Sequence, residues 1–220
     1  MNYAHKGWIP GRYITFEGTD GSGKTTQLEL FYQWLVQEKV PFVATREPGG
    51  SELGRKIREL ILVETVENPT PRAELLLYLA DRAQHLERIV LPALREGKWV
   101  VSDRGVDSTL AYQGVGRGFG IDVLIELHRI LEIWYPPHLT IWVDVEPNEG
   151  LRRKIESGRT DWNRLENETM DFHQRVYQGY VELERRFPDR ILRVDGRGEP
   201  AAIHRRIIAE IVRRFRGSEE

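Results

Sequence analysis

Short apolar runs alternate along the chain with longer segments whose apolar residues recur every three or four positions. The apolar runs predict buried β-strands at Tyr13–Phe16, Phe42–Thr45, Trp99–Asp103, Leu139–Asp144 and Ile191–Asp195. The segments with helical spacing predict α-helices at residues 27–38, 51–63, 71–94, 121–133, 172–187 and 200–215. Because strands and helices alternate, the sequence predicts an α/β fold with a five-stranded, mostly parallel sheet and helices on both faces.

Side-chain orientation and one loop can also be predicted from the pattern. The helix over 51–63 is expected to turn its apolar residues inward, namely Leu53, Ile57, Leu60 and Ile61. The helix over 71–94 has a longer apolar face that begins with Leu75, Leu76 and Leu79. Residues 114–120 contain four glycines and are expected to form a loose loop.

The strongest chemical signal lies between the first strand and the first helix. The chain has Gly18-x-x-x-x-Gly23-Lys24-Thr25 there, which is the full phosphate-binding loop pattern in its strand-to-helix setting. Backbone N–H groups at a helix N-terminus wrap a polyphosphate, and glycines let the backbone come close enough. The expected ATP-binding residues are those of the loop: Gly18, Thr19, Asp20, Gly21, Ser22, Gly23, Lys24 and Thr25. A glycine-rich turn that binds nothing is disfavoured, because spacing, Lys-Thr and both flanking elements agree.

Charged residues follow two further strands, at the edge where open α/β sheets bind ligands. Arg46 follows the second strand as a candidate anion contact, and a solvated loop cation is the alternative. Asp103 and Arg104 end the third strand, where a carboxylate suits Mg²⁺ and an arginine suits a second phosphate; an internal ion pair is the alternative.

Two other features have both a functional and a structural interpretation. Tyr78 and Arg82 lie one helical turn apart and could hold a planar ring, although the residues alone favour a core tyrosine and a surface arginine. Residues 150–164, called here the basic segment, form either a solvated helix face or a mobile lid that closes over phosphates. Its cations are Arg152, Arg153, Lys154, Arg159 and Arg164.

Composition narrows the class of protein. The 220 residues are 40% hydrophobic and 30% charged with a net charge of −2, which gives no reason to expect nucleic acid as a partner. The absence of cysteine excludes disulfides and thiolate catalysis. No apolar run approaches a membrane span or a signal peptide, so we expect a cytoplasmic protein that does not contact a membrane. Residues 1–11 are expected to be a short tail, and residues 12–216 a single domain.

The phosphate-binding loop is shared by several classes of protein. A GTPase would need a guanine-reading Asn-Lys-x-Asp stretch, and the chain has none. A motor ATPase would place a catalytic Glu beside its strand-end carboxylate, whereas Arg104 follows Asp103 here. Chain length, the Asp-Arg pair and the basic segment therefore favour a small kinase.

Several segments, in order and over nearly the whole chain, resemble the thymidylate kinase family of the bacterial type. The matching segments are residues 16–26, Thr45-Arg-Glu-Pro-Gly-Gly50, Tyr78-Leu-Ala-Asp-Arg82, residues 102–114 and Asp144-Val-Glu-Pro147. The resemblance implies a three-layer P-loop nucleoside monophosphate kinase-like fold with a mobile lid at about 150–164. It also implies phosphoryl transfer from ATP to dTMP, giving ADP and dTDP, and a homodimer packed through helices such as the one over 71–94.

The resemblance assigns roles to particular residues. Tyr78 matches the aromatic residue that stacks on thymine, and Arg82 matches the arginine that bonds the base and helps to reject cytosine. Tyr112 matches the residue that crowds the ribose 2′ position, with Gln113 beside it. The groups on the acceptor-phosphate side are Asp20, Arg46, Arg104, Ser108 and Thr109.

Catalysis in such an enzyme consists of positioning and charge neutralisation, because the nucleophile is already a phosphate oxyanion. Residues expected to take part are Lys24, Asp103, Arg104, Arg153 and Arg159, the last two because the loop itself lacks an arginine. Mg²⁺ is expected at Thr25, Asp20 and Asp103. Gly105 departs from the Asp-Arg-Tyr often found in the family, so no tyrosine contact is expected there. A kinase for another nucleotide or nucleoside, and a regulatory module without catalysis, are the alternatives.

Overall fold

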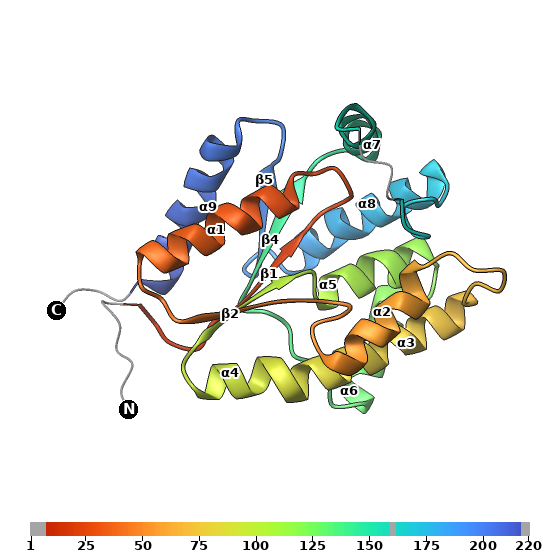
Figure 1. Ribbon diagram of the computed structural model, residues 1–220, viewed down its shortest axis with the longest axis horizontal. Coiled ribbons are helices and arrows are strands. Elements are labelled where there is room, and N and C mark those ends of the chain that lie inside the picture. Colours follow the sequence, from red (N-terminus) through yellow and green to blue (C-terminus); the bar gives the residue numbers. More distant parts are fainter. Residues whose placement is uncertain (1–7, 159–161, 217–220) are drawn as a thin grey trace.

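The computed structural model describes residues 8–158 and 162–216 and confirms the α/β prediction. Five parallel strands form one sheet in the order β2-β3-β1-β4-β5 (Figure 1). The strands are β1 (Tyr13–Glu17), β2 (Phe42–Arg46), β3 (Trp99–Asp103), β4 (Leu139–Asp144) and β5 (Ile191–Asp195). The helices are α1 (Lys24–Gln37), α2 (Glu52–Leu62), α3 (Pro71–His85), η1 (Leu86–Val90), α4 (Leu91–Arg95), α5 (Val106–Thr109), η2 (Leu110–Gly116), α6 (Ile121–Ile130), α7 (Pro147–Glu156), α8 (Met170–Arg186) and α9 (Pro200–Phe215).

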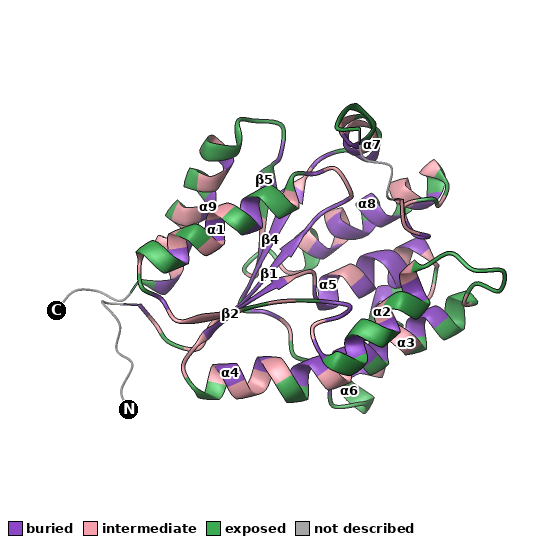
Figure 2. Ribbon diagram, in the orientation of Figure 1, coloured by how far each residue is buried: buried purple, intermediate pink, exposed green. Residues whose placement is uncertain are grey.

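Helices cover the sheet on both faces and make a three-layer structure (Figure 1). On one face α1 and α9 pack together over a core that includes Phe31 and Ile207. On the other face α3, η2, α6 and α8 enclose a second core that includes Leu110 and Val176. Figure 2 shows the central strands buried and the outward helix faces exposed. Burial on both faces explains why β1, β3 and β4 are nearly continuous apolar runs in the sequence, whereas the edge strands β2 and β5 are partly exposed.

The predicted inward face of α2 is only half correct. Ile57 and Ile61 are buried, but Leu53 and Leu60 are 47% and 60% exposed. Helix α2 packs mainly on α3, with Leu165 against the same stripe, so the buried stripe is narrow, and Leu53 and Leu60 lie one residue outside it. The predicted burial of Leu76 on α3 is also wrong, because Leu76 lies beside the buried stripe of that helix and is 64% exposed.

The predicted loose loop over 114–120 is also partly wrong. The helical segment that begins with α5 continues through η2 as far as Gly116, and η2 packs along α8. Glycine favours this packing because a Cβ at Gly116 would lie 2.9 Å from Phe172, and one at Gly179 of α8 would lie 2.9 Å from the backbone of Ala111. The glycines here allow close helix packing instead of a flexible loop.

Candidate active site

The carboxyl ends of β1, β2 and β3 and the N-terminus of α1 meet at one cleft of about 450 Å³. Most residues that the sequence singles out line this cleft, from the phosphate loop at one end to Tyr78 and Arg82 at the other. Gly18 and Arg46 are exceptions: Gly18 is buried beneath the loop, and Arg46 is exposed at the end of β2. Arg159 lies outside the described residues.

The loop after β1 has the backbone that phosphate binding requires. Gly23 caps α1 in the left-handed region, with φ 89°, and a residue with a side chain rarely adopts that conformation. Gly21, with φ 75°, touches the backbone of Gly150 in α7, so that a Cβ on Gly21 would overlap the Gly150 carbonyl. Helix α1 begins at Lys24, which places its positive dipole end at the cleft.

Lys24 and Asp103 form an ion pair inside the cleft. Burial lowers the pKa of Lys24, and the negative charge of Asp103 opposes that shift. Burial disfavours the Asp103 carboxylate, yet Lys24 and Arg104 hold the pKa of Asp103 below its usual range. The cleft thus carries opposite charges side by side at the predicted site for triphosphate and metal.

Arg104 occupies the middle of the cleft in a left-handed conformation, with φ 68°. Its guanidinium donates to Asp20 Oδ1 at 3.2 Å, to Ser108 Oγ at 3.1 Å and to Tyr180 Oη at 3.3 Å. It also lies 5.1 Å from the centre of the Tyr112 ring. These contacts fix a cation between the phosphate loop and the Tyr78 end of the cleft.

A buried carboxylate, Glu17, supports the turn that carries Arg104. Glu17 Oε1 accepts the Gly105 N–H at 2.8 Å, and Oε2 accepts the hydroxyls of Ser108 at 2.5 Å and Tyr180 at 2.8 Å. Burial raises the pKa of Glu17 to about 7, although the Arg104 charge opposes the shift. No sequence pattern marks this role, because Glu17 differs from other strand-end acids only by its neighbours in space.

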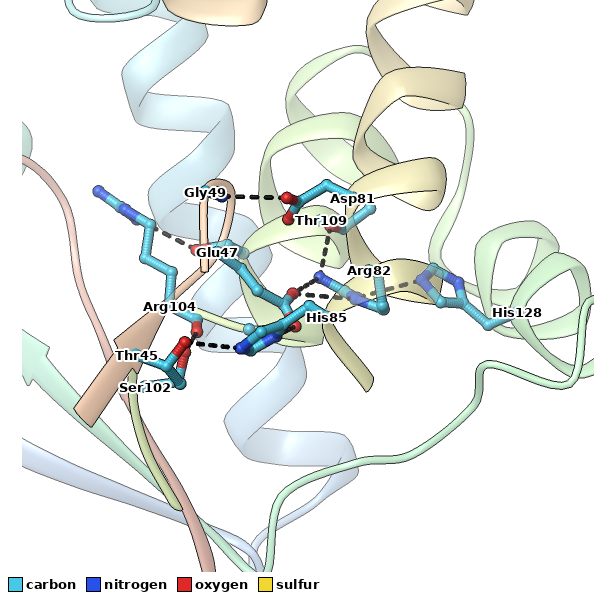
Figure 3. Close-up of polar contacts among 12 residues, drawn as sticks. Thr45, Glu47, Gly49, Asp81, Arg82, His85, Ser102, Arg104, Thr109 and His128 are labelled. Carbon is cyan, nitrogen blue, oxygen red and sulfur yellow. Dashed lines mark hydrogen bonds and ion pairs between the residues drawn. The ribbon is translucent and has the colours of Figure 1, made fainter. Parts of the chain in front are cut away.

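The other end of the cleft is built on two buried ion-pair networks. Arg82 is 3% exposed and bonds Glu47, which also accepts from His85 (Figure 3). Burial disfavours ionised Glu47, but Arg82 and His85 hold its pKa at about 2. In the second network Gln113 donates to Glu74 at 2.9 Å. Arg82 is therefore neither a surface cation nor free to rotate.

The described cations of the basic segment lie in three places, one of them the surface, where Arg152 pairs with Glu149 and Glu156. Arg153 and Lys154 line the cleft, where Arg153 donates to Glu149 and to the Gly196 carbonyl, both contacts under 3 Å. Arg164 is buried instead at the Tyr78 end, where it donates to Glu74 at 2.5 Å and to the Ile61 carbonyl at 2.8 Å.

Sequence reasoning missed several residues of the cleft. Arg58 of α2 and Glu47 line it, and Arg58 donates to the Pro48 carbonyl at 3.0 Å. Glu47 follows Arg46 directly in a Pro-Gly-Gly loop at the ligand-binding edge, a position that could have marked it. Arg58 had no such signal, because a charged residue on a surface helix is ordinary.

Magnesium is the metal that the donor set fits. Asp103 and the exposed hydroxyl residue Thr25 supply hard oxygen ligands beside the phosphate loop, and Mg²⁺ commonly takes one or two protein oxygens plus phosphate and water. Among residues 8–158 and 162–216 there is no group of three His, Cys, Asp or Glu that could hold a metal by itself. No described helix is long and apolar enough to cross a membrane.

Comparison with known proteins gives one consistent answer. The profile of the family described as thymidylate kinase matches residues 16–207. A thymidylate kinase from Carboxydothermus hydrogenoformans is 48% identical over 197 residues, which cover 88% of this chain and 93% of that protein. One from Nostoc punctiforme is 46% identical over 204 residues, covering 92% and 96%.

A solved structure agrees with the sequence comparisons. The crystal structure of thymidylate kinase from Ehrlichia chaffeensis is 31% identical and superposes with a TM-score of 0.73, over 92% of this chain and 98% of that one. The family match over residues 16–207 includes the phosphate loop and every residue that lines the cleft. The chain therefore belongs to the thymidylate kinase family, the enzymes that phosphorylate dTMP to dTDP.

Proposed function

We propose that ATP binds at the phosphate loop, that dTMP binds at the Tyr78 end, and that the γ-phosphoryl group passes between them beside Arg104. The observation that carries this proposal is that one cleft joins the phosphate loop to Tyr78 and Arg82, with the Arg104 guanidinium between. Phosphoryl transfer between nucleotides requires the donor and acceptor phosphates to face each other across a fixed positive charge.

The donor side uses the loop. The N–H groups of Thr19 to Thr25 surround the triphosphate, and Gly18 lets the loop leave β1 beneath them. Lys24 reaches the outer phosphates, and Thr25, Asp103 and Asp20 are the residues that would hold Mg²⁺. The metal neutralises phosphate charge when bound. The Lys24–Asp103 ion pair supports this assignment. When ligands bind, a phosphate can take the place of Asp103 as the partner of Lys24, and a metal cation can take the place of Lys24 as the partner of Asp103.

The acceptor side uses residues from four elements. The Tyr78 ring lies against the thymine, Arg82 bonds the base, and Tyr112 with Gln113 bounds the deoxyribose and the base. Arg104 contacts the acceptor phosphate, and Arg46, exposed beside the cleft, adds positive charge near Asp103. Ser108 and Thr109 act through the arginines, since their hydroxyls accept from Arg104 and Arg82 at 3.1 Å each.

Positive charge over the transferring group comes from the basic segment. Arg153 already lines the cleft and is our leading candidate; Arg159 is the second. Helix α7 touches the phosphate loop at Gly150, so it is placed to close over bound ATP and exclude water. Because ATP is the donor, we also propose that the protein acts in the cytoplasm.

The assay that tests the function couples ADP release to NADH oxidation, with Mg²⁺, ATP and a panel of acceptors. We expect dTMP to be the best acceptor by kcat/KM, ahead of dUMP, dCMP, AMP and thymidine. No ADP with dTMP would refute the activity. A better rate with another monophosphate would refute the acceptor assignment and leave the kinase assignment intact.

A further inference from the structure

Arg82 donates four hydrogen bonds within the protein. Nε and Nη2 donate to Glu47 Oε2 at 3.0 and 2.5 Å, and Nη2 donates to Thr109 Oγ1 at 3.1 Å. Nη1 lies 3.1 Å from His128 Nε2 (Figure 3). A guanidinium has five N–H groups and accepts nothing, so one N–H, on Nη1, is left for a ligand.

The contact with His128 defines the state of that imidazole. Because Arg82 can only donate, His128 Nε2 must be the acceptor. The proton of the neutral ring then lies on Nδ1, which donates to the Leu124 carbonyl at 2.6 Å. Burial, and then the Arg82 charge, lower the pKa of His128 to about 4, so the ring is neutral under ordinary assay conditions.

His128 is well placed to hold Arg82 without touching a ligand. It is fully buried in α6, a helix that contributes no residue to the lining of the cleft. Arg82 does line the cleft, and Glu47 holds the opposite side of its guanidinium. The plane of the guanidinium is thus fixed from both sides, by a carboxylate on one and an imidazole on the other.

We propose that His128 is a positioning residue that sets base selectivity by leaving Arg82 a single N–H to offer the substrate. This inference rests on the proposed function. One fixed donor matches the keto oxygen at position 4 of thymine and opposes the amino group that cytosine has there. Without the imidazole, both N–H groups of Nη1 are free and only Glu47 and Thr109 hold the guanidinium, so the match to one acceptor is weakened.

The test compares three substitutions by steady-state kinetics with dTMP and dCMP. His128→Phe fills the space but accepts no hydrogen bond. We expect it to raise the KM for dTMP about tenfold and to lower the dTMP-to-dCMP ratio of kcat/KM by a similar factor, with kcat within about twofold. His128→Gln can accept through Oε1, which reaches as far as Nε2, and should restore both values. His138→Phe is the matched control, because His138 Nδ1 accepts only the Tyr13 N–H at the other end of β1.

A second comparison separates positioning from general damage. In an Arg82→Ala background, His128→Phe should change neither KM nor the selectivity ratio further, because its only route to the substrate is gone. Equal defects in the Phe and Gln variants, an unchanged selectivity ratio, or an additive effect on Arg82→Ala would each overturn the proposal. If His128→Phe does not fold by circular dichroism, His128→Leu takes its place. If the wild type phosphorylates dTMP in the same assay, the proposed function holds even when the variants contradict the proposal for His128.

Discussion

At the scale of single residues, three buried glutamates near the cleft have different surroundings and therefore different charges. Glu47 faces Arg82 and His85, and Glu74 faces Arg117 and Arg164, so both carboxylates are stabilised in their ionised form. Glu17 accepts hydrogen bonds from hydroxyls and N–H groups, and the nearby Arg104 charge does not offset burial, so its pKa is raised to about 7. Burial alone thus does not decide the charge of an acid here; its nearest cation does.

Glu17 should make stability depend on pH. Its pKa is raised above the ordinary value of 4.5 to about 7, so the folded protein holds the proton more tightly. The stabilising contribution is present below pH 4.5 and is lost as pH rises through 7. The groups facing Glu17 are Arg104, Asp107, Ser108 and Tyr180.

The measurement is the free energy of unfolding in urea for wild type and Glu17→Gln, from pH 4.5 to 8. The wild type minus variant difference should fall as pH rises, by at most about 1.4 kcal/mol per pH unit. His128 acts in the opposite direction, because its lowered pKa costs stability as pH falls from 6.5 towards 4, but it is common to both proteins and cancels. A difference that is flat across this range contradicts a raised pKa.

Lys24 should matter for rate more than for folding. Replacing it with alanine removes the cation that we propose contacts the outer phosphates, and it should lower kcat about 100- to 1000-fold. Lys56→Ala removes an exposed lysine of α2 and is the control, with kcat unchanged. Should Lys24→Ala keep more than a tenth of wild-type kcat while remaining folded, the phosphate role of Lys24 is wrong.

At the scale of elements, apolar patterning predicted every strand of the sheet to within one residue. Buried parallel strands are short apolar runs with no competing interpretation, and Pro or Gly ends most of them. The phosphate loop was equally clear, because its residue types follow from its chemistry. The inward residues of α2 were harder, since Leu53 and Leu60 have the same character as Ile57 and Ile61 and only the neighbouring helix distinguishes them.

The hydrogen bonds that hold Arg82 in the site could not be predicted from the sequence, for a different reason. Glu47, Arg82 and His128 are far apart in sequence, on a loop and two helices, and no local pattern links them. The resemblance to a known family gave Arg82 a role that its helical position alone did not favour. Nothing in the sequence indicated that an imidazole of α6 would hold it.

Packing of η2 on α8 places Tyr112, and Gly179 makes that packing possible. A Cβ at Gly179 would lie 2.9 Å from Ala111 Cα, so Gly179→Ala should push the two helices apart and cost about 1–3 kcal/mol of stability. Thermal and urea unfolding measure the cost, and Gln178→Ala at the exposed neighbouring position is the control. An alanine that proves neutral or stabilising would show that this contact is looser than described.

At the scale of the whole molecule, exposed leucines on α2 and α3 support the expected homodimer. Leu53, Leu60 and Leu76 are each at least 47% exposed, and large apolar side chains gathered on neighbouring helices are typical of protein interfaces. We propose that the dimer packs through this surface. The double variant Leu60→Glu/Leu76→Glu should therefore be monomeric.

Light scattering after size exclusion measures the mass of each protein. Val36→Glu, on the opposite layer in α1, is a control for adding charge at an exposed apolar position and should leave the dimer intact. A dimeric double variant would place the interface elsewhere, and a monomeric wild type would remove the homodimer altogether.

Gly21 and Gly150 bring the phosphate loop and α7 into direct backbone contact, and we expect α7 to tilt about this contact. This backbone-to-backbone contact leaves no room for a side chain on either residue. Glu156 lies six residues beyond Gly150, about 9 Å along the helix, so a small tilt at the contact produces a larger displacement at the end of the helix. Arg153 lies midway along this stretch, so we expect any tilt of α7 to change the distance between its guanidinium and the phosphate loop.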